Sequence, residues 1–321
     1  MRIEWPTLIL IFLCYGVWAV AVFWMPQVHV GLAILVAAPA IALQSSLQHE
    51  VCHGHPFNRR ALGAILVFPT LNLSIPYIRF RDTHLAHHRD ANLTDPYDDP
   101  ESNYLDPKLW RRLPKIVRAI LTFNNTLLGR MAIGPFVAQV VFMRSEWRLV
   151  QNGRIDVMWA WVGHMLIIIG VIWGVSYAPM PVWAYLIAAY LGLSILKIRT
   201  FLEHQAHMRA RGRTVIIEDR GILSFLFLNN NLHVVHHMHP RLPWYQLPQV
   251  YSENREKYLH YNGGYRYRSY AEVFRRHLFY AKDPVPHPFY PQGHIMTPMA
   301  MGRDIVMAPK IHQNTTHVQK V

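Results

Sequence analysis

Asn229–His239 reads NNNLHVVHHMH, and within it His233, His236 and His237 stand at positions i, i+3 and i+4. On a helix, those offsets place three imidazoles on one face within about one turn of each other. Three imidazoles on one face can point at a single centre, which is the arrangement that a metal ion needs. The stretch therefore predicts a short helix that carries metal ligands, and the rest of the chain is expected to bring further ligands to it.

The same histidine pattern occurs a second time, and a shorter version of it a third time. His84, His87 and His88 repeat the offsets in DTHLAHH, while His49 and His53 stand four residues apart in QHEVCHGH. A single histidine is more often a hydrogen-bonded or surface residue than a ligand, but three such clusters are not expected by chance. Nitrogen-rich ligation suits iron, zinc or copper better than calcium or magnesium. Because one ion cannot use all these ligands, two neighbouring ions are predicted.

The composition is that of a membrane protein. Of the 321 residues, 52% are hydrophobic and 16% charged, whereas a soluble domain carries about a quarter charged residues. Lys and Arg are absent between Ile3 and Asn58 and between Ile155 and Leu196, but frequent elsewhere. By the positive-inside rule, this distribution predicts two membrane hairpins with the remaining segments on the cytoplasmic side. The formal net charge of +13 then faces anionic lipid headgroups, and nucleic acid is not expected as a partner because no stacking platform accompanies the Arg residues.

Four apolar stretches are long enough to cross the hydrocarbon core. As two pairs joined by short links, they lie at about residues 6–25, 30–47, 157–177 and 181–201. The predicted fold is an all-α membrane protein with two transmembrane helical hairpins. Residues 1–285 are expected to form one membrane domain, in which 48–156 and 202–285 make a cytoplasmic helical cap that holds the histidines. Residues 286–321, rich in Pro, Gly, Asn and Thr, are expected to form a flexible tail.

Three segments of the predicted cap need separate interpretation. Residues 61–78 are uncharged and about long enough to span, but a crossing would put His84 and His49 on opposite sides, so a re-entrant or membrane-contacting segment is expected. Residues 92–107 contain five carboxylates, and a solvated or helix-capping loop is favoured over a calcium site because the spacing fits no EF-hand loop. Residues 116–143 are apolar but interrupted by polar residues, which is typical of interfacial helices.

These motifs together resemble the membrane fatty acid desaturase and hydroxylase superfamily, whose members hold two iron ions in histidine ligands. The resemblance rests on the order H-x-x-x-H, H-x-x-H-H, H-x-x-H-H on two membrane hairpins, and it runs from about Pro6 to Gln249. The strings HEVCHGHP, DTHLAHHRDANLTDPYDDPES, RTFLEHQAH and NNNLHVVHHMHPRLPWYQLP are similar to the bacterial branch. Relatives in that branch act on acyl lipids, alkanes, carotenoid rings or small amino-acid-derived molecules.

The resemblance implies a set of metal ligands. The family adds one histidine upstream of the third cluster, for which His204 is the better candidate and His207 the reserve. The implied ligands are His49, His53, His84, His87, His88, His204, His233, His236 and His237. Candidates for orienting these imidazoles are Glu50, His55, Asp82, Glu203, His207 and His239. For the three carboxylates, a favourable charge near a helix N-terminus is an equally good explanation.

The activity that the resemblance implies is that of a di-iron oxidoreductase with Fe²⁺ as cofactor and O₂ as co-substrate. Its product would be a fatty acyl or lipid chain with a new C=C bond. Within the superfamily, the alternatives are a hydroxylase (monooxygenase) or a desaturase of a small non-lipid metabolite similar to dihydrorhizobitoxine. A separate electron donor is expected, a ferredoxin, rubredoxin or cytochrome with its reductase, because the chain contains only two Cys and no Pro-Gly-Gly haem signature. The expected location is the bacterial cytoplasmic membrane, with both termini and the active site cytoplasmic.

Two other classes of protein explain part of the sequence. His49-Glu50-Val-Cys-His53 also satisfies H-E-x-x-H, in which two histidines bind zinc and the glutamate is the general base of a protease. That interpretation leaves six clustered histidines unexplained. A metal transporter is also compatible with many histidines, but its ligands are expected near the middle of the membrane rather than at helix ends.

Overall fold

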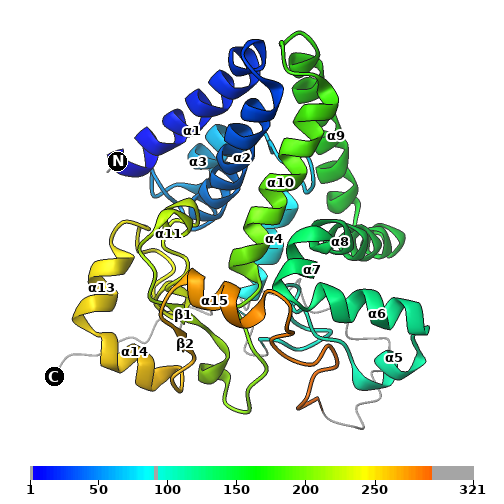
Figure 1. Cartoon of the computed structure of the whole chain (residues 1–321), viewed down its shortest axis with the longest axis vertical. Helices are drawn as coiled ribbons and strands as arrows, with labels where there is room; N and C mark the ends of the chain where they lie inside the picture. Colours follow the sequence, from blue (N-terminus) through cyan, green and yellow to red (C-terminus); the bar gives the residue numbers. More distant parts are fainter. Residues whose placement is uncertain (1–2, 90–92, 291–321) are drawn as a thin grey trace, which may run out of the picture. The chain divides into compact units, whose positions relative to one another are not determined.

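The computed structural model describes residues 3–89 and 93–290, and this part of the chain is mostly helical (Figure 1). Within it, four helices are long and apolar enough to cross a membrane. They are α1 (Trp5–Phe23), α2 (Val30–Cys52), α9 (Ile155–Ser176) and α10 (Val182–Thr200). The predicted fold class, an all-α membrane protein with two helical hairpins, is confirmed. Residues 291–321, most of the predicted tail, lie outside the described residues.

Short turns close the two hairpins. The single 3₁₀ turn η1 (Met25–Gln27) joins α1 to α2, and the His29 side chain caps α2 by accepting a hydrogen bond from the backbone N–H of Leu32 at 3.3 Å. Pro181 precedes α10, where its missing N–H is no loss because the first N–H groups of a helix have no partner within the helix. Each hairpin therefore returns to the side on which it began.

The helix α2 packs against both α1 and α10, and small side chains make the approach close. Ala37 is fully buried, and a Cβ added to Gly192 of α10 would lie 3.0 Å from the Ala38 carbonyl oxygen. In lipid, helix association depends on packing, so small residues at the interface bring backbones together. On the outside, apolar side chains such as Phe12 and Leu166 are exposed, as lipid contact requires. The close pairing of α2 with α10 brings the ends of the two hairpins to one place.

The predicted re-entrant segment contains an eight-residue helix, α3 (Arg60–Val67), which is too short to cross a membrane, followed by irregular backbone. Side chains of the spanning helices donate hydrogen bonds to backbone carbonyl groups of this segment. Gln48 Nε2 donates to the Val67 carbonyl oxygen at 2.9 Å, and Tyr185 Oη donates to that of Leu71 at 2.9 Å. Irregular backbone is tolerated at membrane depth only where such partners exist. The contacts favour the re-entrant interpretation over a spanning helix.

The cap, which is the rest of the described chain, consists mainly of short helices, with one longer helix, α8. They are α4 (Tyr77–His87), α5 (Pro107–Arg112), α6 (Lys115–Asn124), α7 (Leu127–Ala132), α8 (Gly134–Gln151), η2 (Ala210–Arg213), α11 (Ile222–Leu226), α12 (His233–Met238), α13 (Leu247–Glu253), α14 (Arg255–Tyr261) and α15 (Tyr270–His277). Two short strands, β1 (Ile216–Ile217) and β2 (Arg266–Tyr267), pair in parallel. The first residues of the predicted tail pack on this body, because His287 N donates to the Leu105 carbonyl oxygen at 2.8 Å.

A buried ion pair fixes α4 against α8 and α9. Arg79 of α4 donates from Nε and Nη2 to the two carboxylate oxygens of Glu146 at 2.7 and 3.0 Å, and Trp161 Nε1 donates to the same carboxylate at 3.1 Å. Both charged side chains are almost fully buried. Two parallel hydrogen bonds between an arginine and a carboxylate fix the relative orientation of the two side chains as well as adding stability. The ion pair therefore holds α4, which carries the second histidine cluster, in place from one side.

Candidate metal centre

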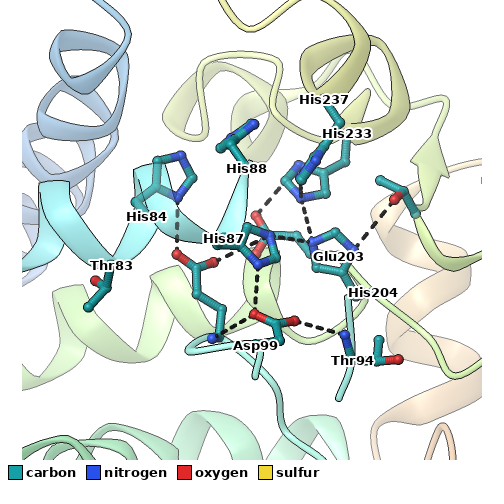
Figure 2. Close-up of polar contacts among 12 residues, drawn as sticks. Thr83, His84, His87, His88, Thr94, Asp99, Glu203, His204, His233 and His237 are labelled. Atoms are coloured by element: carbon teal, nitrogen blue, oxygen red, sulfur yellow. Dashed lines mark hydrogen bonds and ion pairs between the residues drawn. The ribbon is translucent and has the colours of Figure 1, made fainter. Parts of the chain in front are cut away.

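The three histidine clusters converge at the ends of α2 and α10, and His204 joins them just after α10 ends. Figure 2 shows His204 among histidines of the second and third clusters. Nine imidazoles form two groups in which the candidate ligand atoms all lie within 4.8 Å of one another. One group comprises His49, His53, His84, His88 and His236, and the other comprises His87, His204, His233 and His237. The described part of the chain thus brings together every residue of the predicted ligand set.

Each H-x-x-H-H cluster contributes to both groups. His84 on α4 and His88 at its C-terminal cap belong to the first group while His87 belongs to the second, and on α12 neighbouring histidines divide in the same way. The expectation that all three imidazoles of one cluster face a single centre was therefore wrong in this detail. Consecutive residues point in directions about 100° apart on a helix, so adjacent histidines diverge. Because two helices each serve both groups, the two groups adjoin.

Oxygen acceptors fix the protonation of three of the rings. Nδ1 of His87 lies 2.8 Å from Asp99 Oδ1, and Nδ1 of His84 lies 3.0 Å from Glu101 Oε1. Nδ1 of His233 lies 3.0 Å from an oxygen of Asn230. Carboxylate and amide oxygens only accept, so each Nδ1 carries the proton, and in the neutral ring Nε2 has a free lone pair. These contacts are the outer support that metal-ligating histidines require.

The Nε2 atoms face one another inside the site. His87 and His204 approach to 2.9 Å between Nε2 atoms, His204 and His233 to 3.2 Å, and His53 and His84 to 3.1 Å. Where both rings present lone pairs, such an approach is repulsive unless a cation lies between them. Among the described residues, no hydrogen-bond partner exists for the buried Nε2 of His49, an arrangement that costs free energy. These donors fit a metal ion.

Electrostatics keep most of the rings neutral. Burial lowers the pKa of His204, His233 and His236 well below the usual value, and neighbouring imidazoles lower it further. Neutral imidazole is the form that binds metal. His87 differs: burial opposes its protonation, but Glu101 and Asp99 raise its pKa to about 9. Without a cation in the site, the His87 ring therefore takes up a proton more readily than an ordinary histidine.

The predicted orienting residues on the helices that leave the membrane lie in different surroundings. Glu203 Oε1 accepts from Asn230 Nδ2 at 3.1 Å and lies 4.0 Å from His233 Nδ1, so it supports the site mainly through Asn230. The Glu50 carboxylate instead accepts from the backbone N–H of Trp244 at 2.9 Å, and lies 3.7 Å from His55 Nε2. Glu50 therefore ties the first cluster to the loop after the third, whereas the closer contact of His55 is with Glu4, 2.7 Å from Nδ1 to the carboxylate.

The remaining three candidates are engaged outside the two histidine groups. Asp82 pairs with Arg81 at 2.7 Å. His207 contacts the Arg209 carbonyl oxygen through Nδ1 at 3.0 Å. His239 Nε2 lies 3.1 Å from Tyr258 Oη. Of the two candidates for the extra ligand, the structure brings His204 into the second group, while His207 is not among the grouped residues.

Sequence reasoning missed Asp99, Glu101 and Asn230. The interpretation of residues 92–107 as a solvated or capping loop was only partly right. Asp106 does cap α5, accepting from Lys108 N at 2.6 Å, but the Asp99 side chain is 1% exposed and accepts from Thr94 N at 2.8 Å besides contacting a histidine. The sequence did hold a signal for Asp99 and Glu101, because a cluster of carboxylates follows shortly after the second histidine cluster. Histidines that bind a metal often donate their second ring N–H to a carboxylate.

An all-helical membrane fold whose two hairpins end in a buried, histidine-lined site defines a class of membrane protein with a candidate metal centre. A model of the fatty acid desaturase family matches residues 24–269, and the chain belongs to this family. The resemblance inferred from the motifs is thus confirmed.

Two curated relatives are similar to the chain, and both are described as chloroplastic omega-3 fatty acid desaturases. The protein from Glycine max is 26% identical over 241 residues, which cover 64% of this chain and 49% of the relative. The protein from Brassica napus is 24% identical over 236 residues, covering 64% and 55%. The chain spans about half the length of the curated relatives it matches.

Proposed function

We propose that the chain is a desaturase-type oxidoreductase that holds one iron ion in each histidine group and uses dioxygen to introduce a C=C bond into a fatty acyl or lipid chain. The convergence of nine imidazoles in two adjoining groups carries this proposal. Imidazole ligation suits iron. When bound, the irons would supply the oxygen activation and the oxidation of an unactivated C–H bond. Overall, the substrate loses two hydrogen atoms and dioxygen becomes two waters, with two further electrons and two protons.

The work of the protein's own groups is to fix the ligands. Asp99, Glu101 and Asn230 each accept the Nδ1 proton of one histidine, which leaves Nε2 free to bind metal. Asp99 is itself held by the backbone N–H of Thr94, so its orientation does not depend on His87 alone. Fixed partners of this kind keep the ligand geometry constant when the site exchanges substrate or electrons.

Burial of the site supports chemistry that must exclude water. The side chain of His87 is 0% exposed, and His49 and His233 are buried as well. A dry site would protect the oxidation chemistry that bound irons supply from side reactions with water. The location at the ends of two spanning helices also suits a substrate that arrives from the bilayer, such as a lipid acyl chain. We place the site on the cytoplasmic side of a bacterial inner membrane, with both termini on that side, because of the charge distribution.

Rival functions have less support. A zinc protease would need Glu50 as general base beside the metal, but that carboxylate accepts from Trp244 N. A transporter would need ligands near mid-membrane, whereas His49 lies near the end of α2 and His204 beyond the end of α10. Hydroxylation, or a small metabolite as substrate, stays the alternative within the family. The electron donor is proposed to be a separate ferredoxin, rubredoxin or cytochrome with its reductase.

The deciding experiment measures metal and product together. The purified chain in lipid nanodiscs is analysed for bound metals, and lipids and polar metabolites of cells with and without it are compared by mass spectrometry. Two irons per chain and a new unsaturated acyl product are expected. One zinc per chain would favour the protease, metal that exchanges freely would favour the transporter, and a hydroxylated product would replace desaturation by hydroxylation.

A further inference from the structure

A groove lined by arginines lies on the surface of the cap, between residues of β2 and α15. Figure 1 shows these two elements beside each other. The volume of the groove is about 540 Å³. Arg266 and Arg268 reach it from β2 and the residue after that strand, and Arg275 and Arg276 reach it from α15. Four guanidinium groups from two elements therefore surround one hollow.

Two of the four arginines are neutralised and two are not. Arg266 pairs with Glu218 at 2.7 Å, and Arg276 pairs with Glu272 at 2.6 Å. Arg268 and Arg275 are exposed, and no ion pair joins either to a carboxylate in the part of the chain that the structure describes. The groove therefore keeps an excess of positive charge. Membrane topology alone would explain basic residues anywhere on this side, but it does not explain their convergence on one groove.

Aromatic rings connect the groove to the second histidine group. The Arg276 guanidinium lies 5.7 Å from the centre of the Tyr267 ring, and Tyr267 Oη lies 2.9 Å from His277 Nε2. The His277 ring is 5.8 Å from that of Phe201, which stands three residues before His204 in the chain. Short steps between rings and covalent bonds thus connect the surface to a residue of the candidate metal centre.

We propose that this groove is the docking site of an acidic one-electron carrier protein. The inference rests on the proposed function, which needs two electrons from outside for each substrate molecule. In each docking event the reduced carrier is oxidised by one electron, which passes to the metal centre, and two such events supply both electrons. Charge complementarity speeds encounter and selects the partner, and arginine is enriched at the cores of protein interfaces.

The test uses the full-length protein in nanodiscs and a reduced plant-type [2Fe–2S] ferredoxin as the probe. In the variant R268E/R275E, ferredoxin binding is expected to weaken on the order of tenfold at low ionic strength. The difference in ferredoxin affinity between the wild type and this variant is expected to shrink at high salt, because salt screens the attraction between exposed charges. Product formation in a single turnover should stay unchanged when the protein is first reduced with dithionite without O₂, then freed of dithionite and exposed to O₂. The matched control is R209E/R211E, which removes the same charge from two exposed positions in and beside η2.

Three results would overturn the docking site. They are equal loss of ferredoxin binding in the control, no loss in R268E/R275E, or a selective loss of binding to anionic phosphatidylserine vesicles with ferredoxin binding intact. The last result would assign the groove to lipid headgroups. Failure of the proposed function is a separate observation, because wild-type protein would then form no product even with dithionite, whereas ferredoxin binding is measured without turnover.

Discussion

The Asp99 carboxylate lies 2.8 Å from Nδ1 of His87, and both side chains are almost fully buried. The two residues come from different segments, a loop and α4, so this contact ties the loop to the site. The Asp99 oxygen holds the His87 proton on Nδ1 and directs Nε2 toward His204. This relationship predicts that the loop is part of the metal centre.

Replacing Asp99 by Ala is expected to weaken iron binding by about 10- to 100-fold, the usual cost of removing the partner of a ligating histidine. The D99N variant keeps an oxygen acceptor and is expected to lose less. Iron content after dialysis against a graded chelator measures the effect. The control D98N removes the charge of a neighbouring exposed residue, and equal loss in that variant would mean that the acidic loop acts only through its overall charge.

His204 and His207 provide a second comparison, because both were candidates for the extra ligand. The variant H204A is expected to lose bound iron and product formation, since His204 Nε2 lies 2.9 Å from that of His87 and 3.2 Å from that of His233. The variant H207A should retain both properties, because His207 contacts the Arg209 carbonyl oxygen instead. Measuring the iron content of the two purified variants is sufficient to decide which histidine is the extra ligand. If the H204A variant bound as much iron as the wild type, His204 would not be a metal ligand.

Eight of the nine grouped histidines were predictable because helical spacing is local: His233, His236 and His237, for example, share one turn whatever the tertiary structure. The ninth, His204, was predicted only from the family resemblance. The division of the histidines into two groups was less visible, since it depends on how α4 and α12 face each other. Asn230 stands only three residues before its partner His233, but nothing in the sequence shows that its side-chain oxygen accepts the Nδ1 proton. Glu101 reaches His84 from a loop 17 residues further along the chain, so spacing could not assign it either. The two membrane hairpins were predictable from the length of the apolar stretches and from the distribution of Lys and Arg. The packing of the cap was not, because it depends on contacts between segments far apart in the sequence.

The buried pair of Arg79 and Glu146 predicts a large effect on stability. The variant E146A leaves a buried guanidinium without its partner, and such changes cost about 3–5 kcal/mol of unfolding free energy. The exposed pair of Arg154 and Asp156 is the control, and D156N is expected to cost no more than about 1 kcal/mol. Thermal unfolding in detergent compares them. Similar melting temperatures for the two variants would show that α8 does not hold α4 in place.

Glu218 predicts a pH dependence in the cap. Burial alone would raise its pKa, but hydrogen bonds from Arg255, Tyr251 and Arg266 lower the pKa from 4.5 to about 2. A carboxylate whose pKa is lower in the folded state stabilises it above the unfolded pKa, and the contribution is lost as the pH falls through the folded pKa. E218Q should therefore be less stable than wild type at neutral pH, and the difference should shrink between pH 4.5 and 2. Urea unfolding of the cap measures it, and a difference constant with pH would contradict the ionic origin.

Gly192 tests whether the pairing of the two hairpins sets the site. A Cβ at this position would lie 2.9 Å from Ile41 Cγ2 and 3.0 Å from the Ala38 carbonyl oxygen, so G192V must push α10 away from α2. Overpacking of this kind costs about 1–3 kcal/mol. Since α2 carries His49 and α10 leads to His204, iron content should fall together with stability. The matched variant G163V on α9 meets no atom within 4 Å and should change neither property. If G192V lost stability but bound iron normally, the histidine groups would be held by the cap rather than by the spanning helices.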